Sequence, residues 1–278
     1  MKNIVLGLLA ETFIHPGIGR NEGAIDLPVA REAATDYPYI PGSSLKGALR
    51  DHARDHGMQG IETCFGEQAC AGDLLVSDAR LLLLPVRSLS GSYKWVTSTL
   101  ALERLRRDCE RVGQSIAFTT PRAPAEGKVL GKGDGMLYLE ERVCSYEGPV
   151  PDNLVEDLCR LIRHQPVRQR LAEQLVILND KDFAWYARYA LAVQARNVLD
   201  EETKESKNLW YEETLPPDTL FYALLASRTD RDGLNSMRRQ LRTNPWLQAG
   251  GNETVGQGWL ATQIMGESEN QGGQGDES

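Results

Sequence analysis

The sequence has no apolar run long enough to cross a membrane. A membrane-spanning helix needs about 20 mostly apolar residues, whereas the apolar stretch 81–86 is short and lies between Arg80 and Arg87. The stretch 1–13 begins like a signal peptide, but Glu11 interrupts it and no small-residue cleavage site follows. We therefore expect a cytoplasmic protein whose first segment is a strand.

The sequence also lacks paired cysteines. Its five cysteines are an odd number, and no two of them have the CxxC spacing of a zinc ribbon. A disulfide framework, typical of small secreted proteins, is therefore not indicated. We expect reduced thiols at Cys64, Cys70, Cys109, Cys144 and Cys159.

There is no excess of positive charge. The chain carries 31 Lys and Arg against 39 Asp and Glu, a formal charge of −8, although a basic surface is the usual mark of a nucleic-acid-binding protein. Half of the acidic excess lies in residues 266–278, which contain four acidic residues and no Lys or Arg. We predict that this tail is disordered, so any RNA site must be a local basic groove.

Helical and strand-like patterns alternate along the chain. Strand character occurs at 3–13, and residues 43–57 have the spacing of an amphipathic helix that ends at Gly57. The Gly- and Pro-rich stretch 115–150 indicates an insertion with a mobile loop. Interleaved helices and strands predict the α+β class with a ferredoxin-like core. The other predicted elements are strands at 73–88, 174–180, 183–200, 219–228 and within 250–265, and helices at 95–113 (N-cap Thr97 or Ser98), 152–164 and 231–244.

The helix at 43–57 begins with a candidate phosphate site. Ser43 and Ser44 lie at its amino-terminal end, where free backbone N–H groups and the helix dipole favour an anion. Lys46 and Arg50 are four residues apart and share a face. An ordinary capped helix with a solvated basic stripe explains the same residues, and from spacing alone it is the favoured interpretation.

A second candidate phosphate contact is the Gly-rich segment 244–259. Its glycines would let backbone approach a ligand closely, and its polar residues would add hydrogen bonds. The segment matches neither the GxGxxG fingerprint nor a P-loop, so a mononucleotide site is unsupported. A phosphate cradle and a plain turn are equal alternatives. The residues concerned are Gly250, Gly251, Asn252, Thr254, Gly256 and Gly258.

Reactive side chains are concentrated in the loop 15–28. His15 and Glu22 can act as acid or base, Arg20 can contact a phosphate, and Asp26 adds a carboxylate. Asp and Asn are also frequent in turns for capping reasons. Composition alone favours an unremarkable turn.

Two histidines, His52 and His56, have the i, i+4 spacing of a metal clamp on a helix. No HExxH pattern and no third ligand accompany them, which favours exposed helix residues over a metal site. Aromatic residues at 185–189, 210–211 and 221–222 are able to stack on bases. Most of them are expected in the core.

Taken together, these segments resemble the RAMP superfamily of CRISPR proteins, and most closely its fourth-subunit family from the type III-B Cmr complex. The resemblance covers most of the chain. It is carried by HPG at 15–17, GAIDLP at 23–28, IPGSSLKG at 40–47, DARLL at 78–82, PVRS at 85–88, LWYEE at 209–213, LPP at 215–217 and GGNETVG at 250–256.

The resemblance implies one RAMP domain at 1–265, with a ferredoxin-like (RRM-like) palm, insertions around 115–150, irregular loops and a thumb hairpin around 195–210. Copies of the chain would stack as a helical filament along the guide region of crRNA, together with other Cmr subunits. The thumb would wedge into the guide–target duplex and flip a base pair out, which exposes a neighbouring phosphodiester to in-line attack. The acidic stretch 200–205 is a departure that leaves the register of the thumb open.

The same resemblance implies an endoribonuclease that cuts single-stranded target RNA, with Asp26 essential and a divalent metal, Mg²⁺ or Mn²⁺, present. Attack by the 2′-hydroxyl of the target needs a proton acceptor and a neutralised phosphate, so Asp26 is either the base or a metal ligand. His15 would donate to the leaving oxygen or steer the phosphate, with Tyr211, Glu212 and Glu213 completing the site. Guide contacts would come from Arg20, Ser43, Ser44, Lys46, Arg50, Gly250, Gly251, Asn252, Thr254 and Gly256.

Two other functions stay open at this point. A RAMP subunit that only holds crRNA would have the same RNA-binding residues without catalysis. A stand-alone endonuclease that processes the CRISPR precursor transcript would cut repeat RNA without metal or partners. The catalytic interpretation depends on Asp26.

Overall fold

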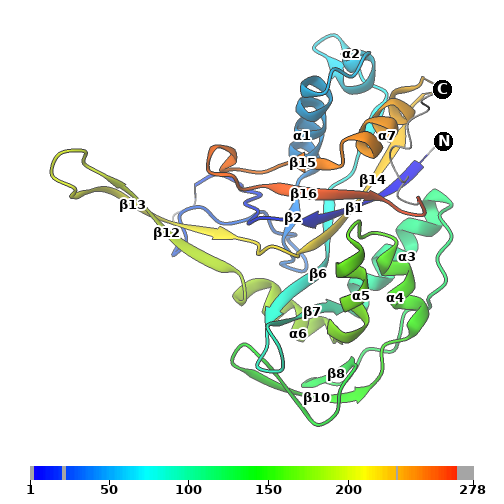
Figure 1. The fold of residues 1–278 in the computed structure, drawn as a ribbon, viewed down its shortest axis with the longest axis vertical. Helices are drawn as coiled ribbons and strands as arrows, with labels where there is room; N and C mark the ends of the chain where they lie inside the picture. The colour runs from blue at the N-terminus through cyan, green and yellow to red at the C-terminus, as the bar shows by residue number, and fades with distance from the viewer. Residues whose placement is uncertain (1–2, 21–22, 230, 268–278) are drawn as a thin grey trace, which may run out of the picture.

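The computed structural model describes residues 3–20, 23–229 and 231–267. Glu22 and most of the predicted acidic tail, residues 268–278, lie outside the described residues. The core of the fold is two split β-α-β units that share one sheet (Figure 1).

The first unit runs from β1 (Asn3–Ala10) through α1 (Gly42–Asp55) to β5 (Leu74–Val76) and β6 (Ala79–Arg87). The second unit runs from β14 (Leu220–Ser227) through α7 (Gly233–Thr243) to β16 (Trp259–Ile264). In the sheet these strands have the order β16-β1-β14-β6, and each pairs antiparallel with its neighbour. This is the ferredoxin-like arrangement, which confirms the predicted fold class.

Burial on both faces of the sheet explains the apolar sequence of β1. Leu6 belongs to the core cluster on one side of the sheet, and Val5 to the cluster on the other side. In the middle of the strand, Gly7 lies against the backbone of Leu161, where a Cβ atom would come within 2.0 Å of the carbonyl oxygen. The strand therefore needs glycine at this position for space.

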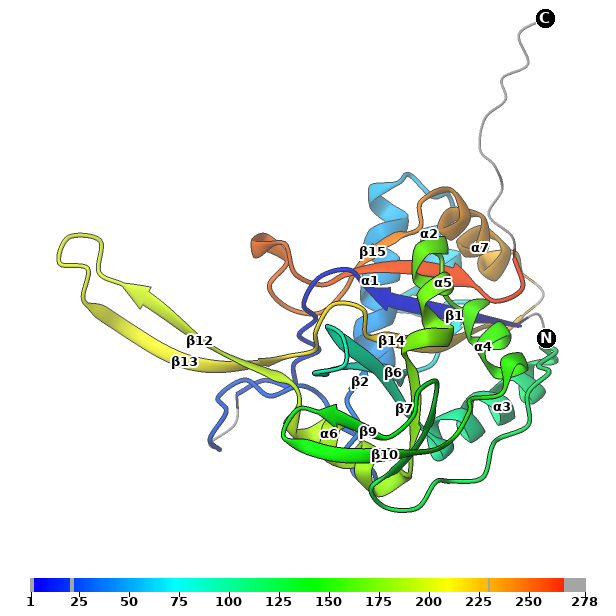
Figure 2. The ribbon, with the colours of Figure 1, turned by 60° about the horizontal axis from the view of Figure 1, so that its bottom comes forward.

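The sheet continues beyond β6 into the middle of the sequence. β7 (Tyr93–Ser98) pairs with β6, β11 (Leu175–Leu178) lies parallel to β7, and β8 (Lys128–Gly131), β10 (Arg142–Gly148) and β9 (Met136–Leu139) complete this edge. Helices α3 (Thr99–Val112), α4 (Asp152–Cys159) and α5 (Gln165–Gln174) pack on one face of the sheet, against β1 as well as β6 and β7 (Figure 2). Within the stretch 115–150, three strands therefore extend the sheet, while residues 114–125 form neither helix nor strand.

Short elements complete the fold. They are β2 (Tyr39–Ile40), α2 (Ile61–Phe65), β3 (Gly66–Glu67), β4 (Cys70–Ala71), β15 (Trp246–Gln248) and the 3₁₀ turn η1 (Glu253–Val255). All five cysteines are free thiols, and burial raises the pKa of Cys64 and of Cys109 to about 12. In the part of the chain described, no helix is both long and apolar enough to span a membrane.

One predicted element is wrong in type. Residues 183–189, expected as part of a strand, form most of α6 (Asp180–Tyr189). The Asn179 side chain caps this helix by accepting a first-turn N–H at 2.9 Å, and Phe183 and Tyr186 lie on its buried face. Aromatic residues favour strands on average, but their i, i+3 spacing here is helical.

The helix predicted at 152–164 is also shorter than expected. It ends at Cys159, because tight turns follow in which the N–H of Leu161 donates to Leu158 at 3.0 Å and that of Ile162 donates to Cys159 at 3.1 Å. These turns bring Leu161 against β1 beside Gly7. The close approach of two backbones thus overrides the helical pattern.

A hairpin of β12 (Ala192–Leu199) and β13 (Ser206–Thr214) projects far from the body of the protein (Figures 1 and 2). Its strands pair from Ala192 opposite Thr214 to Leu199 opposite Ser206. The stretch 200–205 is therefore the turn at the tip. Along the strands, large apolar side chains are exposed at Val193, Val198, Leu199, Leu209 and Tyr211.

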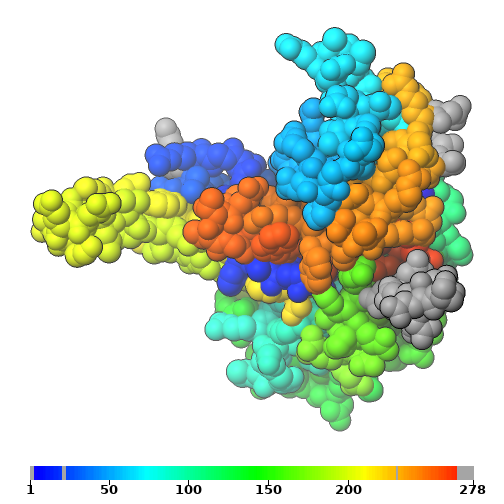
Figure 3. All heavy atoms as spheres, turned by 45° about the horizontal axis from the view of Figure 1, so that its top comes forward, coloured from blue at the N-terminus to red at the C-terminus, as the bar shows by residue number. Residues whose placement is uncertain are grey.

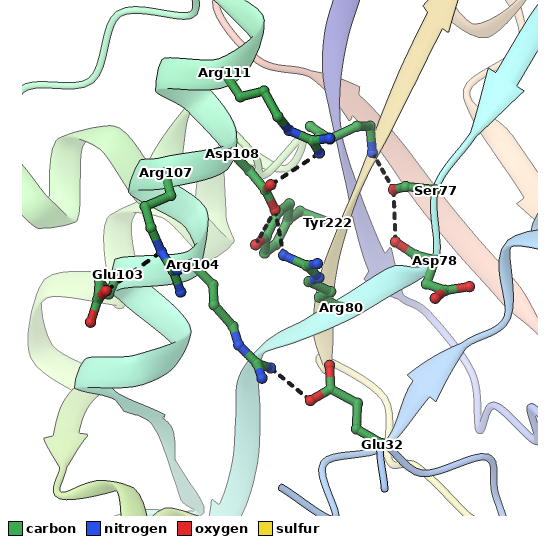
Figure 4. Close-up of polar contacts among 11 residues, drawn as sticks. Glu32, Ser77, Asp78, Arg80, Glu103, Arg104, Arg107, Asp108, Arg111 and Tyr222 are labelled. Carbon is green, nitrogen blue, oxygen red and sulfur yellow. Dashed lines mark hydrogen bonds and ion pairs between the residues drawn. The ribbon is translucent and has the colours of Figure 1, made fainter. Parts of the chain in front are cut away.

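A buried carboxylate joins α3 to the palm. Asp108 accepts hydrogen bonds from Arg80 Nη1 at 2.7 Å and from the Tyr222 hydroxyl at 3.0 Å, and its other oxygen accepts from Arg111 at 3.1 Å (Figure 4). Arg80 belongs to β6 and Tyr222 to β14. Burial and the nearby Asp108 carboxylate raise the pKa of Tyr222, which keeps its hydroxyl protonated as a donor.

We expect Asp108→Leu to lower the free energy of unfolding by about 2 kcal/mol, because the buried Tyr222 hydroxyl loses its acceptor and the partly exposed Arg80 loses its ion pair. Tyr222→Phe removes one hydrogen bond and keeps the ring, so this matched control should cost about 1 kcal/mol. Urea unfolding of the purified chain measures both values. If Asp108→Leu unfolded at the wild-type midpoint, the network would not be joining α3 to the palm.

Candidate functional site

Three segments far apart in the sequence enclose a groove of about 700 Å³. One wall is the amino-terminal loop 15–19 with Leu27, the second is a face of α1, and the third is β15 with residues 249–253. Figure 3 shows the amino-terminal loop, α1 and the segment before β16 beside one another, next to the base of the hairpin. Of the predicted site residues, the groove brings together His15, Ser44, Gly250 and Gly251.

His15 lies in the wall of this groove with 7% of its surface exposed. Its Nδ1 is 2.7 Å from the backbone carbonyl of Glu213 and 3.6 Å from the carboxylate of Glu212. The His15 carbonyl accepts the N–H groups of Gly17 at 3.0 Å and of Gly251 at 2.9 Å. The residue is therefore fixed between β13 and the Gly-rich segment.

Glu212 and Glu213 are adjacent on β13 and only 2% and 3% exposed. The Glu212 carboxylate accepts hydrogen bonds from Arg196 Nε at 3.2 Å and from the Asn252 amide. The Glu213 carboxylate accepts from Arg31 Nη2 at 2.6 Å and from a backbone N–H at 3.1 Å. Both carboxylates are thus occupied by partners inside this chain.

Asp26 is half-buried beside β13, where the hairpin leaves the body. Its Oδ2 accepts the backbone N–H of Tyr211 at 2.8 Å. Leu27 continues this pairing, because its N–H donates to the Tyr211 carbonyl at 3.1 Å and its carbonyl accepts from the Glu213 N–H at 3.0 Å. Asp26 and His15 are therefore attached to the same short stretch of β13, Asp26 to Tyr211 and His15 to Glu213.

The two basic residues predicted on α1 face a different hollow. This hollow, of about 460 Å³, is lined by Lys46, Arg50, Arg228 and parts of the turn 66–72. The Arg50 Nε is buried and has no hydrogen-bond partner among the described residues. The predicted RNA contacts are thus divided between two surfaces on either side of α1.

The amino terminus of α1 already carries a carboxylate. Asp78 accepts the N–H of Gly42 at 2.7 Å, while Ser43 and Ser44 are exposed on the first turn and the residue at the N-cap makes no side-chain cap. Part of the predicted anion-binding capacity of this helix end is therefore used within the chain.

Other predicted contacts lie outside the groove wall. Arg20, Thr254 and Gly256 are exposed and do not line the groove. Asn252, with φ of 66°, donates its amide to Glu212 and, at 3.0 Å, to Gln257, so it supports the site from within.

The paired histidines of α1 line the same groove, with ring centroids 4.4 Å apart. The expectation that both are exposed is wrong for His52, which is 6% exposed because it falls in the same buried helical stripe as Leu45 and Leu49. Burial lowers the pKa of His52. Among the described residues, no group of three or more His, Cys, Asp or Glu side chains is arranged to hold a metal ion.

Several residues that hold this site together were not identified from the sequence. Arg31 and Arg196 each bind a buried glutamate, and Gly17 leaves space beside the His15 ring. Arg196 lies opposite Trp210 and so reaches Glu212 diagonally across the hairpin. The pairing of Arg196 with Glu212 can be predicted from the sequence only when the register of the hairpin is known.

Comparisons with known proteins identify the family. The chain matches the model of the RAMP superfamily over residues 8–261. It is 33% identical to the CRISPR system Cmr endoribonuclease Cmr4 of Pyrococcus furiosus over 98% of this chain and 99% of that protein.

Solved structures agree with this result. The crystal structure of oligomeric Cmr4 from Pyrococcus furiosus is 29% identical, with a TM-score of 0.76 over 95% of this chain and 98% of that one. A chain of the type III-B Cmr-beta complex bound to cognate target RNA is 21% identical, with a TM-score of 0.76 over 94% of this chain and 96% of its own, and supports the fold alone. The family match, the full-length relative and the split β-α-β palm together show that this protein belongs to the RAMP superfamily.

Proposed function

We propose that this protein is a backbone subunit of a type III-B CRISPR RNA-guided complex, which binds the guide region of crRNA and cleaves complementary target RNA endonucleolytically at regular intervals. The observation that carries the proposal is the attachment of Asp26 and His15 to one stretch of β13 at the base of the projecting hairpin. The full-length relative is named an endoribonuclease, which favours catalysis over a subunit that only holds crRNA.

The hairpin has the form of a wedge. Its strands expose apolar side chains, including Val198, Leu199 and Leu209, which suit contact with unstacked bases. The acidic residues near its tip lie in the turn at 200–205, where Asp200 pairs with Lys207 at 2.7 Å. A nucleotide displaced by this wedge would leave its phosphodiester near the base of the hairpin, where Asp26 lies.

The partners in this proposal are crRNA, single-stranded target RNA, further copies of the chain in a helical filament and other Cmr subunits, all in the cytoplasm. The oligomeric form of the Pyrococcus furiosus relative supports contacts between copies. The hollow with Lys46, Arg50 and Arg228 is the basic surface best suited to the guide backbone.

Cleavage by the 2′-hydroxyl needs a proton acceptor and stabilisation of the charge that develops on the phosphate. One oxygen of Asp26 accepts the Tyr211 N–H, and no hydrogen bond engages the other oxygen among the described residues. Tyr211 therefore orients Asp26 through its backbone, and Glu212 positions His15 from inside the protein.

A divalent ion fits this site only as one shared with RNA. The described residues offer no ligand set of their own, but Mg²⁺ commonly binds through one or two carboxylates together with phosphate oxygens. Asp26 is the residue that would hold Mg²⁺ or Mn²⁺ in this way. The ion would supply positive charge beside the phosphate.

We expect Asp26→Ala to reduce target cleavage by at least about 100-fold, the range of a lost catalytic group, while guide binding and assembly persist. Labelled target RNA incubated with the reconstituted complex and magnesium gives the rate. Asp134→Ala, which removes an exposed loop carboxylate in the other half of the protein, is the control and should cut normally. If the Asp26→Ala complex cut target RNA at the wild-type rate, this chain would not be the nuclease, and the alternative of a subunit that only holds crRNA would be favoured.

The double reversal Lys46→Glu with Arg50→Glu should weaken guide binding steeply. Each lost phosphate contact removes nearly one unit from the slope of log affinity against log salt concentration. Lys128→Glu with Lys132→Glu, a second pair of basic residues four positions apart and on the exposed surface, is the control for the change of charge. An unchanged salt slope in the first variant would mean that this face of α1 contacts protein or solvent.

If the chain is the repeated subunit, every copy presents an identical Asp26 and the target products should form a ladder of constant step. Mixing wild-type and Asp26→Ala subunits should then dim all bands together, because equivalent positions are filled at random. Gel separation of end-labelled target reads the bands. Selective loss of one band would instead point to a single cutting site in a partner subunit.

A further inference from the structure

The contacts of His15 fix which ring nitrogen carries the proton. Its Nδ1 is 2.7 Å from the Glu213 carbonyl oxygen. A carbonyl accepts hydrogen bonds and never donates them, so Nδ1 must be the protonated nitrogen. In the neutral ring, Nε2 then carries a lone pair and no proton.

The opposite side of the ring is kept clear by glycine. A Cβ atom on Gly17 would lie 2.5 Å from Nε2, and one on Gly251 would lie 3.2 Å from the adjacent Cδ2. Gly17 has no left-handed backbone angle, so its glycine is required by space and not by conformation. Both residues line the groove with His15, and Nε2 has no hydrogen-bond partner among the described residues.

The His15 ring also has a carboxylate next to its Nδ1 side. The Glu212 carboxylate lies 3.6 Å from Nδ1 and is itself fixed by Arg196 and Asn252. All of these contacts are on the Nδ1 side, within the protein. Nε2 is thus the one polar atom of the ring that faces the groove.

We propose that His15 accepts the 2′-hydroxyl proton at Nε2, and that Gly17 is a positioning residue that keeps Nε2 open to the groove; this rests on the proposed function above. In this step the 2′ oxygen forms a bond to phosphorus while its proton moves to Nε2. The bond from phosphorus to the 5′ oxygen breaks, and that oxygen takes a proton from water. The products are a 2′,3′-cyclic phosphate and a 5′-hydroxyl.

This assignment separates the roles of the two side chains. Donation to the leaving oxygen would require a proton on Nε2, so in this proposal that donation is left to water. With the base assigned to His15, Asp26 is left for the phosphate side of the reaction, where its one unengaged oxygen suits a shared cation.

The first test is independent of activity. Nitrogen-15 NMR of the full chain labelled at histidine reports the tautomer of each ring, and the chain has only four histidines. The His15 signals, identified by their loss in His15→Gln, should show neutral imidazole protonated at Nδ1. Protonation at Nε2 would overturn the proposal.

The second test closes the space beside Nε2. Gly17→Ala in the reconstituted complex should reduce target cutting about 100-fold, as expected for loss of a general base, with guide binding unchanged. Gly148→Ala is the control, because the Cβ atom there meets its nearest neighbour at an ordinary 3.6 Å. Full-rate cutting by Gly17→Ala would overturn the role of Gly17.

Chemical rescue covers the case in which Gly17→Ala does not assemble. His15→Gly should cut slowly and recover at least tenfold on addition of imidazole, because the added base occupies the vacated space. Failure of imidazole to restore any cutting would count against His15 as the base. The failure of the proposed function is a separate outcome. If a complex with Asp26→Ala cut target RNA like the wild type, the proposed function would be refuted, but the NMR result would still decide the tautomer of His15.

Discussion

Two buried carboxylates on adjacent residues of one strand determine how the segments around the site are held together. Successive side chains of a strand point to opposite faces, so Glu212 and Glu213 must each find separate partners, and an unpaired buried charge would cost several kcal/mol. Glu212 is met by Arg196 and Asn252, and Glu213 by Arg31. The hairpin, the Gly-rich segment and the amino-terminal loop are thereby held to one strand.

α1 separates two surfaces of different character. The face toward the groove carries Asp51 and Asp55 with Arg54, whereas the other hollow carries Lys46, Arg50 and Arg228 with Glu67. In the proposed function, the basic side holds the guide backbone and the groove holds the reacting part of the target. In that function a single helix would separate the guide RNA from the target RNA, and the local cluster of basic residues would offer a phosphate contact on a chain of net charge −8.

The palm could be predicted because its elements follow simple periods. The alternation of helices and strands indicated the ferredoxin-like core, and Ser98 caps α3 by accepting the Ala101 N–H at 3.2 Å. α6 was missed because aromatic residues suggested a strand. In the site, His15 and Asp26 were predicted from their chemistry and from the resemblance. Neither the chemistry nor the resemblance predicts that Glu212 is buried. Its environment comes from residues 16 and 40 positions away in the sequence, which local patterns do not contain.

The register of the hairpin has a consequence for how its length can change during evolution. Arg196 reaches Glu212 only because Ala195 and Tyr211 are opposite each other. A slip of one residue would turn every side chain of β13 to the other face, exchanging the surroundings of two buried glutamates and detaching both Asp26 and His15. Insertions that leave the pairing at the base intact alter only the reach of the arm. The length of the hairpin can therefore change during evolution by residues added symmetrically at its tip. The pairs at its base, from Ala192 opposite Thr214 to Arg196 opposite Trp210, must keep their register.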